Sequence, residues 1–135
     1  MRSNAFLSPD FAIRWSSLQP EAVEPAMTEA LAQAERAIAR IAEQSPATAS
    51  YESTFLALDQ ATELVTVPWG KVTHLQSVAD SPALREAHNA VLPKVAAFLA
   101  GIPLNPQLWL VLREFAATPA ATRLTGVRAR HLRET

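Results

Sequence analysis

The three histidines are the residues of this chain best suited to hold a metal ion. A structural zinc site needs four ligands, and a catalytic zinc site needs three ligands and a water molecule. His74 and His88 fall in neighbouring predicted helices, and the chain has no cysteine that could add a thiolate. His131 has only Glu134 one helical turn away. We therefore expect no metal site in this chain, and structural or solvent-facing histidines instead.

The sequence after each histidine also excludes the motif of a zinc peptidase. That motif, His-Glu-x-x-His, places two histidines one turn apart on a helix with a glutamate between them. Here the histidines are followed by Leu75-Gln76, Asn89-Ala90 and Leu132-Arg133. We expect His74, which lies near Trp69 and Val72, to hydrogen-bond the end of a neighbouring helix.

Other catalytic chemistries find no better support. No serine lies in a Gly-x-Ser-x-Gly or Ser-x-x-Lys arrangement, and three glycines are too few for a phosphate-binding loop. Glu52 and Asp59 are seven residues apart and share a helix face, but nothing else marks them as an acid–base pair. The sequence therefore predicts no catalytic and no cofactor-binding residues.

Two further sets of side chains leave alternatives open. One is a series of arginines in the last third of the chain, which either form a solvated helical face or contact another domain at a channel mouth. The other is the three tryptophans, which are better suited to anchor helices than to bind a ligand. The arginines are Arg113, Arg123, Arg128, Arg130 and Arg133, and the tryptophans are Trp15, Trp69 and Trp109.

Length and charge narrow the class of protein. A chain of 135 residues suits one domain, here 1–135, and a net charge of −1 disfavours nucleic acid and anionic lipid as partners. The absence of cysteine fits a reducing compartment. The N-terminal apolar run is too short for a signal peptide, and no stretch approaches the roughly 20 apolar residues that span a bilayer. We expect a soluble cytoplasmic protein that binds neither nucleic acid nor membrane.

The high content of alanine and leucine, interrupted by prolines along the chain, predicts an all-α fold of about five to six helices. We expect them to be arranged as antiparallel hairpins or a bundle. Residues 1–19 read as an extended arm, anchored by apolar side chains that include Phe6, Phe11 and Leu18. A first helix is expected from about Pro20 to Ser45. Its apolar side chains recur at steps of three and four.

Prolines and capping residues set the remaining boundaries. Ser50 is expected to cap the second helix, and Pro68 to break or kink it. Ser81-Pro82, Asn105-Pro106 and Thr118-Pro119 each combine a cap with proline at the first helical position. The last helix is expected to contain Gly126, at about 1 kcal/mol relative to alanine, and its lack of a stop signal suggests that the natural chain continues.

Several stretches resemble, in order and at matching distances, the N-terminal region of the oligopeptidase A and thimet oligopeptidase family of zinc metallopeptidases. They are NAFL, RWSSLQPEAVEPAM, YEST and VTHLQSVADSPALREAHNAVLPKV. The most specific residues are His74-Leu75, Val78, Ser81-Pro82, Leu84-Arg85 and Leu92-Pro93. Ala22 stands where members often have histidine, and Ser53 where asparagine is common. Both lie at helix starts and affect local capping.

The resemblance implies an all-α segment that forms part of one wall of a deep channel. In the family, this wall lies over a catalytic domain that binds zinc through a His-Glu-x-x-His helix and a further glutamate, and it limits substrates to short peptides. This chain then represents the N-terminal helical domain of such an oligopeptidase, inactive alone, with the zinc and the catalytic domain elsewhere in the same polypeptide. Surfaces left bare without that domain favour self-association.

The alternative is a self-contained helical module that binds a partner protein or dimerises. The reading frame beyond Thr135 discriminates between the two: a downstream His-Glu-x-x-His supports the peptidase, and a stop codon supports the module.

Overall fold

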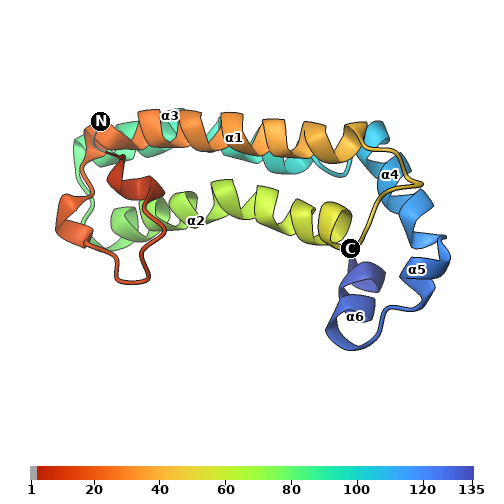
Figure 1. Ribbon diagram of the computed structural model, residues 1–135. Coiled ribbons are helices and arrows are strands. Elements are labelled where there is room, and N and C mark those ends of the chain that lie inside the picture. The colour runs from red at the N-terminus through yellow and green to blue at the C-terminus, as the bar shows by residue number, and fades with distance from the viewer. Residues whose placement is uncertain (1–2) are drawn as a thin grey trace.

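The computed structural model describes residues 3–135, and every regular element in that range is helical (Figure 1). Three long helices lie side by side and contact one another pairwise. They are α1 (Val23–Glu43), α2 (Ala57–Val78) and α3 (Pro82–Gly101). Three shorter helices follow at one end of this bundle: α4 (Pro106–Ala116), α5 (Pro119–Thr122) and α6 (Gly126–Glu134). The predicted all-α fold with an N-terminal arm is confirmed.

Helix α1 begins and ends close to the predicted positions. A short 3₁₀ turn, η3 (Pro20–Ala22), leads into it, and Gln44 with an extended backbone ends it. The apolar side chains at steps of three and four form one buried stripe along the helix. This stripe consists of Val23, Met27, Leu31, Ala34, Ile38 and Ile41, with Ala26 and Ala30 beside it.

The arm is anchored by fewer apolar side chains than predicted. Phe6 is fully buried and Leu18 nearly so, and the chain between them folds into two 3₁₀ turns, η1 (Ala5–Leu7) and η2 (Trp15–Ser17). Phe11 is fully exposed, so its prediction as an anchor is wrong. It lies in a bend of the arm between η1 and η2. Residues 1 and 2 of the predicted arm lie outside the described range.

Helix α2 begins with a wider turn and runs through its proline. Ser50 and Ser53 each accept a hydrogen bond from the other's backbone amide, at 3.0 and 2.9 Å, which confirms the predicted cap. A π-helical turn, η4 (Glu52–Leu56), follows. Of the break or kink predicted at Pro68, the break is wrong, because α2 continues to Val78. Val65 and Val72, both fully buried, hold the turns on either side of Pro68 against the same core.

The caps predicted for the later helices are present. The side chain of Ser81 accepts a hydrogen bond from the amide of Leu84 at 3.1 Å, and that of Asn105 accepts one from Leu108 at 3.0 Å. Thr118 caps α5 in the same way. These N-caps form as predicted, because the donor and the acceptor of each hydrogen bond are only three residues apart in sequence.

The chain after Thr118 differs from the prediction. One helix was expected there, with Gly126 in its interior, but the structure has two, and Gly126 starts the second with φ at +60°. This left-handed conformation is the reason for a glycine at this position, since a Cβ atom disfavours it. The predicted glycine penalty inside a helix therefore does not arise.

The buried side chains form two clusters that meet at Phe98. One joins the arm to α1, α2 and α3, and the other joins the far ends of α1 and α2 to η4, α4 and α5. Within residues 3–135, no single helix is long and apolar enough to cross a membrane; α3 and α4 reach that length and composition only when taken together across a 41° bend.

Candidate functional site

The three histidines lie apart, and each contacts an aromatic ring. His74 lies against Trp15 and His88 stacks on Trp69, both with ring centroids 4.8 Å apart. Among the described residues, no group of three histidine, aspartate or glutamate side chains is placed to hold a metal ion. The helix-end hydrogen bond expected for His74 is replaced by its ring contact with the arm.

His131 lies at the centre of the contact between α6 and the start of α2. Its Nδ1 is 2.8 Å from the hydroxyl of Tyr51, and its Nε2 is 3.1 Å from Oδ2 of Asp59. In the neutral tautomer that fits these partners, Nε2 donates to the carboxylate and Nδ1 accepts from the phenol. The imidazole thus ties α6 to η4 and α2, although α6 has no buried residue of its own.

The same contact separates the two carboxylates considered as an acid–base pair. Asp59 faces His131, whereas Glu52 forms an ion pair with Arg128 at 2.7 Å. The guanidinium of Arg128 also lies 5.1 Å from the centre of the Tyr51 ring, within the range of a cation–π contact. Glu52 therefore pairs with the guanidinium of Arg128 and Asp59 contacts the imidazole of His131, so both carboxylates have a role in docking α6.

The arginines of the last third fall into two groups. Arg128 and Arg130 are used within the domain, the latter in an ion pair with Glu134 at 2.9 Å. Arg113, Arg123 and Arg133 are exposed, and none of them takes part in the ion pairs formed among residues 3–135.

The tryptophans differ in their surroundings. Trp69 packs against the core, as expected of an anchor, and Trp15 joins the arm to α2 through His74. Trp109 is exposed, and its indole N–H donates to the carbonyl of Pro103 at 2.7 Å. It fixes the turn between α3 and α4 and leaves one ring face toward solvent.

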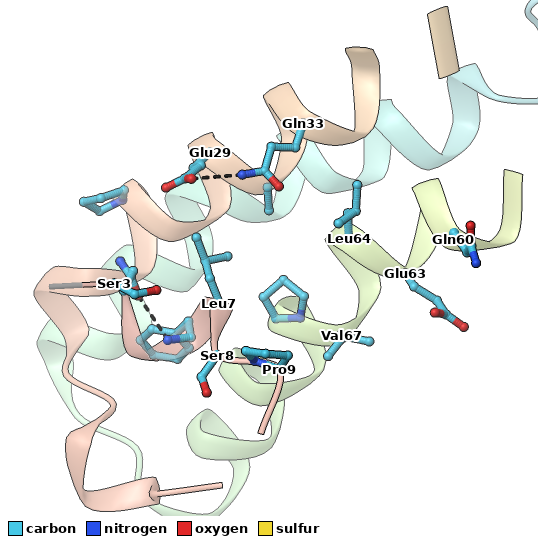
Figure 2. Close-up of a pocket in the computed structure, with 15 residues that line it drawn as sticks. Ser3, Leu7, Ser8, Pro9, Glu29, Gln33, Gln60, Glu63, Leu64 and Val67 are labelled. Carbon is cyan, nitrogen blue, oxygen red and sulfur yellow. Dashed lines mark hydrogen bonds between the residues drawn. The ribbon is translucent and has the colours of Figure 1, made fainter. Parts of the chain in front are cut away.

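A hollow lies where the arm crosses the α1–α2 pair (Figure 2). Its volume is about 760 Å³, and its apolar lining includes Leu7, Leu64 and Val67. Its polar lining includes Glu29 and Glu63, and no lysine or arginine lines it within the described chain. The lining of the hollow therefore combines apolar side chains with two carboxylates.

A second hollow, of about 420 Å³, continues along the same pair of helices. Gln60 and Leu64 line both hollows, so the two adjoin. The only charged side chain that lines the second hollow, within the described chain, is Arg40. We call the two together the α1–α2 groove; Glu29 and Glu63 line its first hollow and Arg40 lines its second.

The α1–α2 groove depends on a buried lysine. Lys71 is only 6% exposed, and its Nζ donates to the backbone carbonyls of Phe6 and Ser8 at 3.0 and 2.8 Å. These two bonds hold the arm against α2. Neither the role of the lysine nor the groove was predicted from the sequence, although the position of Lys71 directly before the apolar Val72 is an available signal.

Comparison with known proteins agrees with this architecture. The family model described as "Neurolysin/Thimet oligopeptidase, N-terminal domain" matches residues 26–134. Oligopeptidase A from Salmonella typhimurium is 30% identical over 100 residues, which cover 74% of this chain and 15% of the relative. Oligopeptidase A from Escherichia coli is 29% identical over 112 residues, 83% of this chain and 16% of the relative.

The chain thus spans roughly one sixth of the length of these curated relatives, and no solved structure matches it. The family match covers α1 to α6 almost completely. The chain belongs to the neurolysin/thimet oligopeptidase N-terminal domain family.

Proposed function

We propose that this chain is the N-terminal helical domain of a zinc-dependent oligopeptidase and forms part of the wall of its substrate channel. The observation that carries the proposal is the family match over residues 26–134, in a chain that has no His-Glu-x-x-His motif. The donor set of residues 3–135 does not fit a zinc ion, since no three ligands converge. The zinc therefore belongs to a catalytic domain, which we place in the same polypeptide and in the cytoplasm.

In this role the domain contributes shape and no catalytic group. A rigid wall of packed helices limits which substrates reach a catalytic centre, and short peptides are the class that passes. Exposed apolar side chains on α3 and α4 and in the turn between them offer a surface for the catalytic domain. They are Leu92, Leu99, Leu104, Trp109 and Leu110.

Two assays test the proposal. The purified chain, incubated with zinc and a quenched fluorescent peptide, is expected to give no cleavage that a chelator abolishes. A chimera in which residues 26–134 replace the matched segment of Escherichia coli oligopeptidase A is expected to retain chelator-sensitive cleavage. A chimera that folds, as judged by circular dichroism, and lacks all activity contradicts the wall role.

The second candidate is a stand-alone interaction module that dimerises, and the same exposed apolar side chains favour it. Light scattering over a hundredfold range of concentration separates the candidates. An isolated wall domain self-associates weakly and without fixed stoichiometry, whereas a module forms a defined dimer that the double substitution Leu92→Ser and Leu99→Ser dissolves.

A further inference from the structure

We propose that the loop of the arm between η1 and η2 encloses a site for a small oxyanion, the chemistry that phosphate and carboxylate ligands share. Within the described chain, the lining of this site has only Ser8 in common with the α1–α2 groove. The proposal concerns binding to the arm and does not depend on the proposed function. An enclosed hollow, a buried ammonium group and an excess of positive charge carry it.

A hollow of about 250 Å³ lies between this loop and α2 (Figure 1). The loop is fixed to α2 on both sides. On one side Lys71 donates to the carbonyls of Phe6 and Ser8, and on the other the ring of Trp15 lies 4.8 Å from that of His74. One water molecule takes about 30 Å³ of the liquid, so the hollow equals about eight of them. It therefore has room for a phosphate or carboxylate group together with several water molecules.

The buried cation of the site is Lys71, which lines the hollow and is only 6% exposed. An ammonium group has three N–H donors, and the carbonyls of Phe6 and Ser8 accept from two of them. Among residues 3–135, Nζ has no third acceptor and Lys71 forms no ion pair. A buried charge is unfavourable without a counter-ion, so an anion in the adjoining hollow is stabilised by this ammonium group.

The loop supplies two further donors. Arg14 lines the hollow, is exposed and takes part in none of the ion pairs formed within the described chain. The hydroxyl oxygen of Ser8 accepts a hydrogen bond from the amide of Asp10 at 3.3 Å, which leaves the hydroxyl hydrogen to donate. The hydroxyl of Ser17, in contrast, already donates to the carbonyl of Arg14 at 2.7 Å.

The charges of the lining favour an anion. Asp10 is the one carboxylate that lines the hollow among the described residues, against the two cations Lys71 and Arg14. The guanidinium of Arg14 can meet a phosphate or a carboxylate with two parallel N–H donors. Because Lys71 belongs to α2 and Arg14 to the far side of the loop, a bound oxyanion joins the loop to the helix.

The test titrates the full chain with sodium phosphate at neutral pH and follows ¹H–¹⁵N chemical shifts. Sodium chloride keeps the ionic strength constant, so general screening of surface charges does not change. The expected result is saturable shifts in residues 8–17 and 70–74, with a Kd in the millimolar range. Sodium acetate is titrated in parallel, and the lower of the two Kd values assigns the site to a phosphate or to a carboxylate ligand.

Two exposed side chains give substitutions with opposite expected effects. Arg14→Gln is expected to raise the Kd about two- to fivefold, the range of an exposed ion pair. Asp10→Asn is expected to lower the Kd by a similar factor, because it removes the charge that opposes the anion. Arg36→Gln and Glu114→Gln remove exposed charges that do not line this hollow, and are the matched controls.

Lys71→Met is expected to abolish the saturable shifts. Since this substitution also releases the arm from α2, the exposed pair Arg14 and Asp10 keeps the test independent of folding. The proposal is overturned by shifts that do not saturate, by saturable shifts outside the loop and α2, by binding that Lys71→Met retains, or by Arg14 and Asp10 variants that behave like the controls. None of these outcomes bears on whether the parent enzyme cleaves peptides.

Discussion

The ammonium group of Lys71 lies 3.0 Å from the carbonyl oxygen of Phe6, across 65 residues of sequence. Lys71 also donates a hydrogen bond to the carbonyl oxygen of Ser8. These two hydrogen bonds hold the same part of the arm whose Phe6 ring is buried in the core. Together they attach the arm to α2, and side chains of the arm, among them Leu7 and Pro9, line the first hollow of the α1–α2 groove.

Replacing Lys71 with methionine is expected to destabilise the protein by about 2 kcal/mol, because two backbone carbonyls lose a charged donor. Methionine keeps the length and apolar stem of the side chain, so the loss reports on the ammonium group. The measurement is the free energy of unfolding in urea. Lys94→Met, an exposed position on α3, is the control and is expected to change stability by less than about 0.5 kcal/mol.

The two phenylalanines of the arm are expected to respond very differently to truncation. Phe6→Ala removes a fully buried ring and is expected to lower the free energy of unfolding by about 3–5 kcal/mol. Phe11→Ala removes a fully exposed ring and is expected to have an effect below about 0.5 kcal/mol. Equal effects of the two substitutions on urea denaturation contradict the placement of the arm.

Removal of the Asp59 carboxylate is expected to loosen α6 without unfolding the bundle. Asp59→Asn weakens the partner of His131 Nε2, which is one of the few polar contacts that hold α6, a helix with no buried side chain. Amide hydrogen exchange is expected to become several-fold faster in residues 126–134, an effect of about 1 kcal/mol on local opening. Exchange in α3 is the internal control. An equal increase in the exchange rates of α3 and α6 contradicts a local role for the contact between Asp59 and His131.

Two glycines are expected to respond to alanine with opposite signs. Gly70 lies inside α2 with open space around its Cβ position, so Gly70→Ala is expected to stabilise by about 0.5–1 kcal/mol through helix propensity. Gly126 has φ at +60°, so Gly126→Ala is expected to destabilise the start of α6 by about 1–2 kcal/mol. Thermal and urea unfolding measure the first, and hydrogen exchange of α6 measures the second.

Local signals in the sequence predicted the helix starts well. Ser81, Asn105 and Thr118 cap their helices as expected, because a cap involves a side chain and an amide three residues away. The continuation of α2 through Pro68 was not predictable in this way. It depends on buried neighbours such as Val65 and Val72 meeting side chains from distant segments.

The groove and the hydrogen bonds of Lys71 were not predicted, for one shared reason. Glu29, Arg40 and Glu63 are ordinary charged residues of amphipathic helices when read in sequence, and only the pairing of α1 with α2 sets them along one depression. Lys71 meets Phe6 only because the arm folds back over α2. The family resemblance, in contrast, rests on residue identities, and the family match confirms it.

The two buried clusters meet at Phe98, and α1 and α2 run through both of them. The same two helices line both hollows of the α1–α2 groove. Loss of packing in either cluster is therefore expected to change the spacing of these helices and with it the width of the groove.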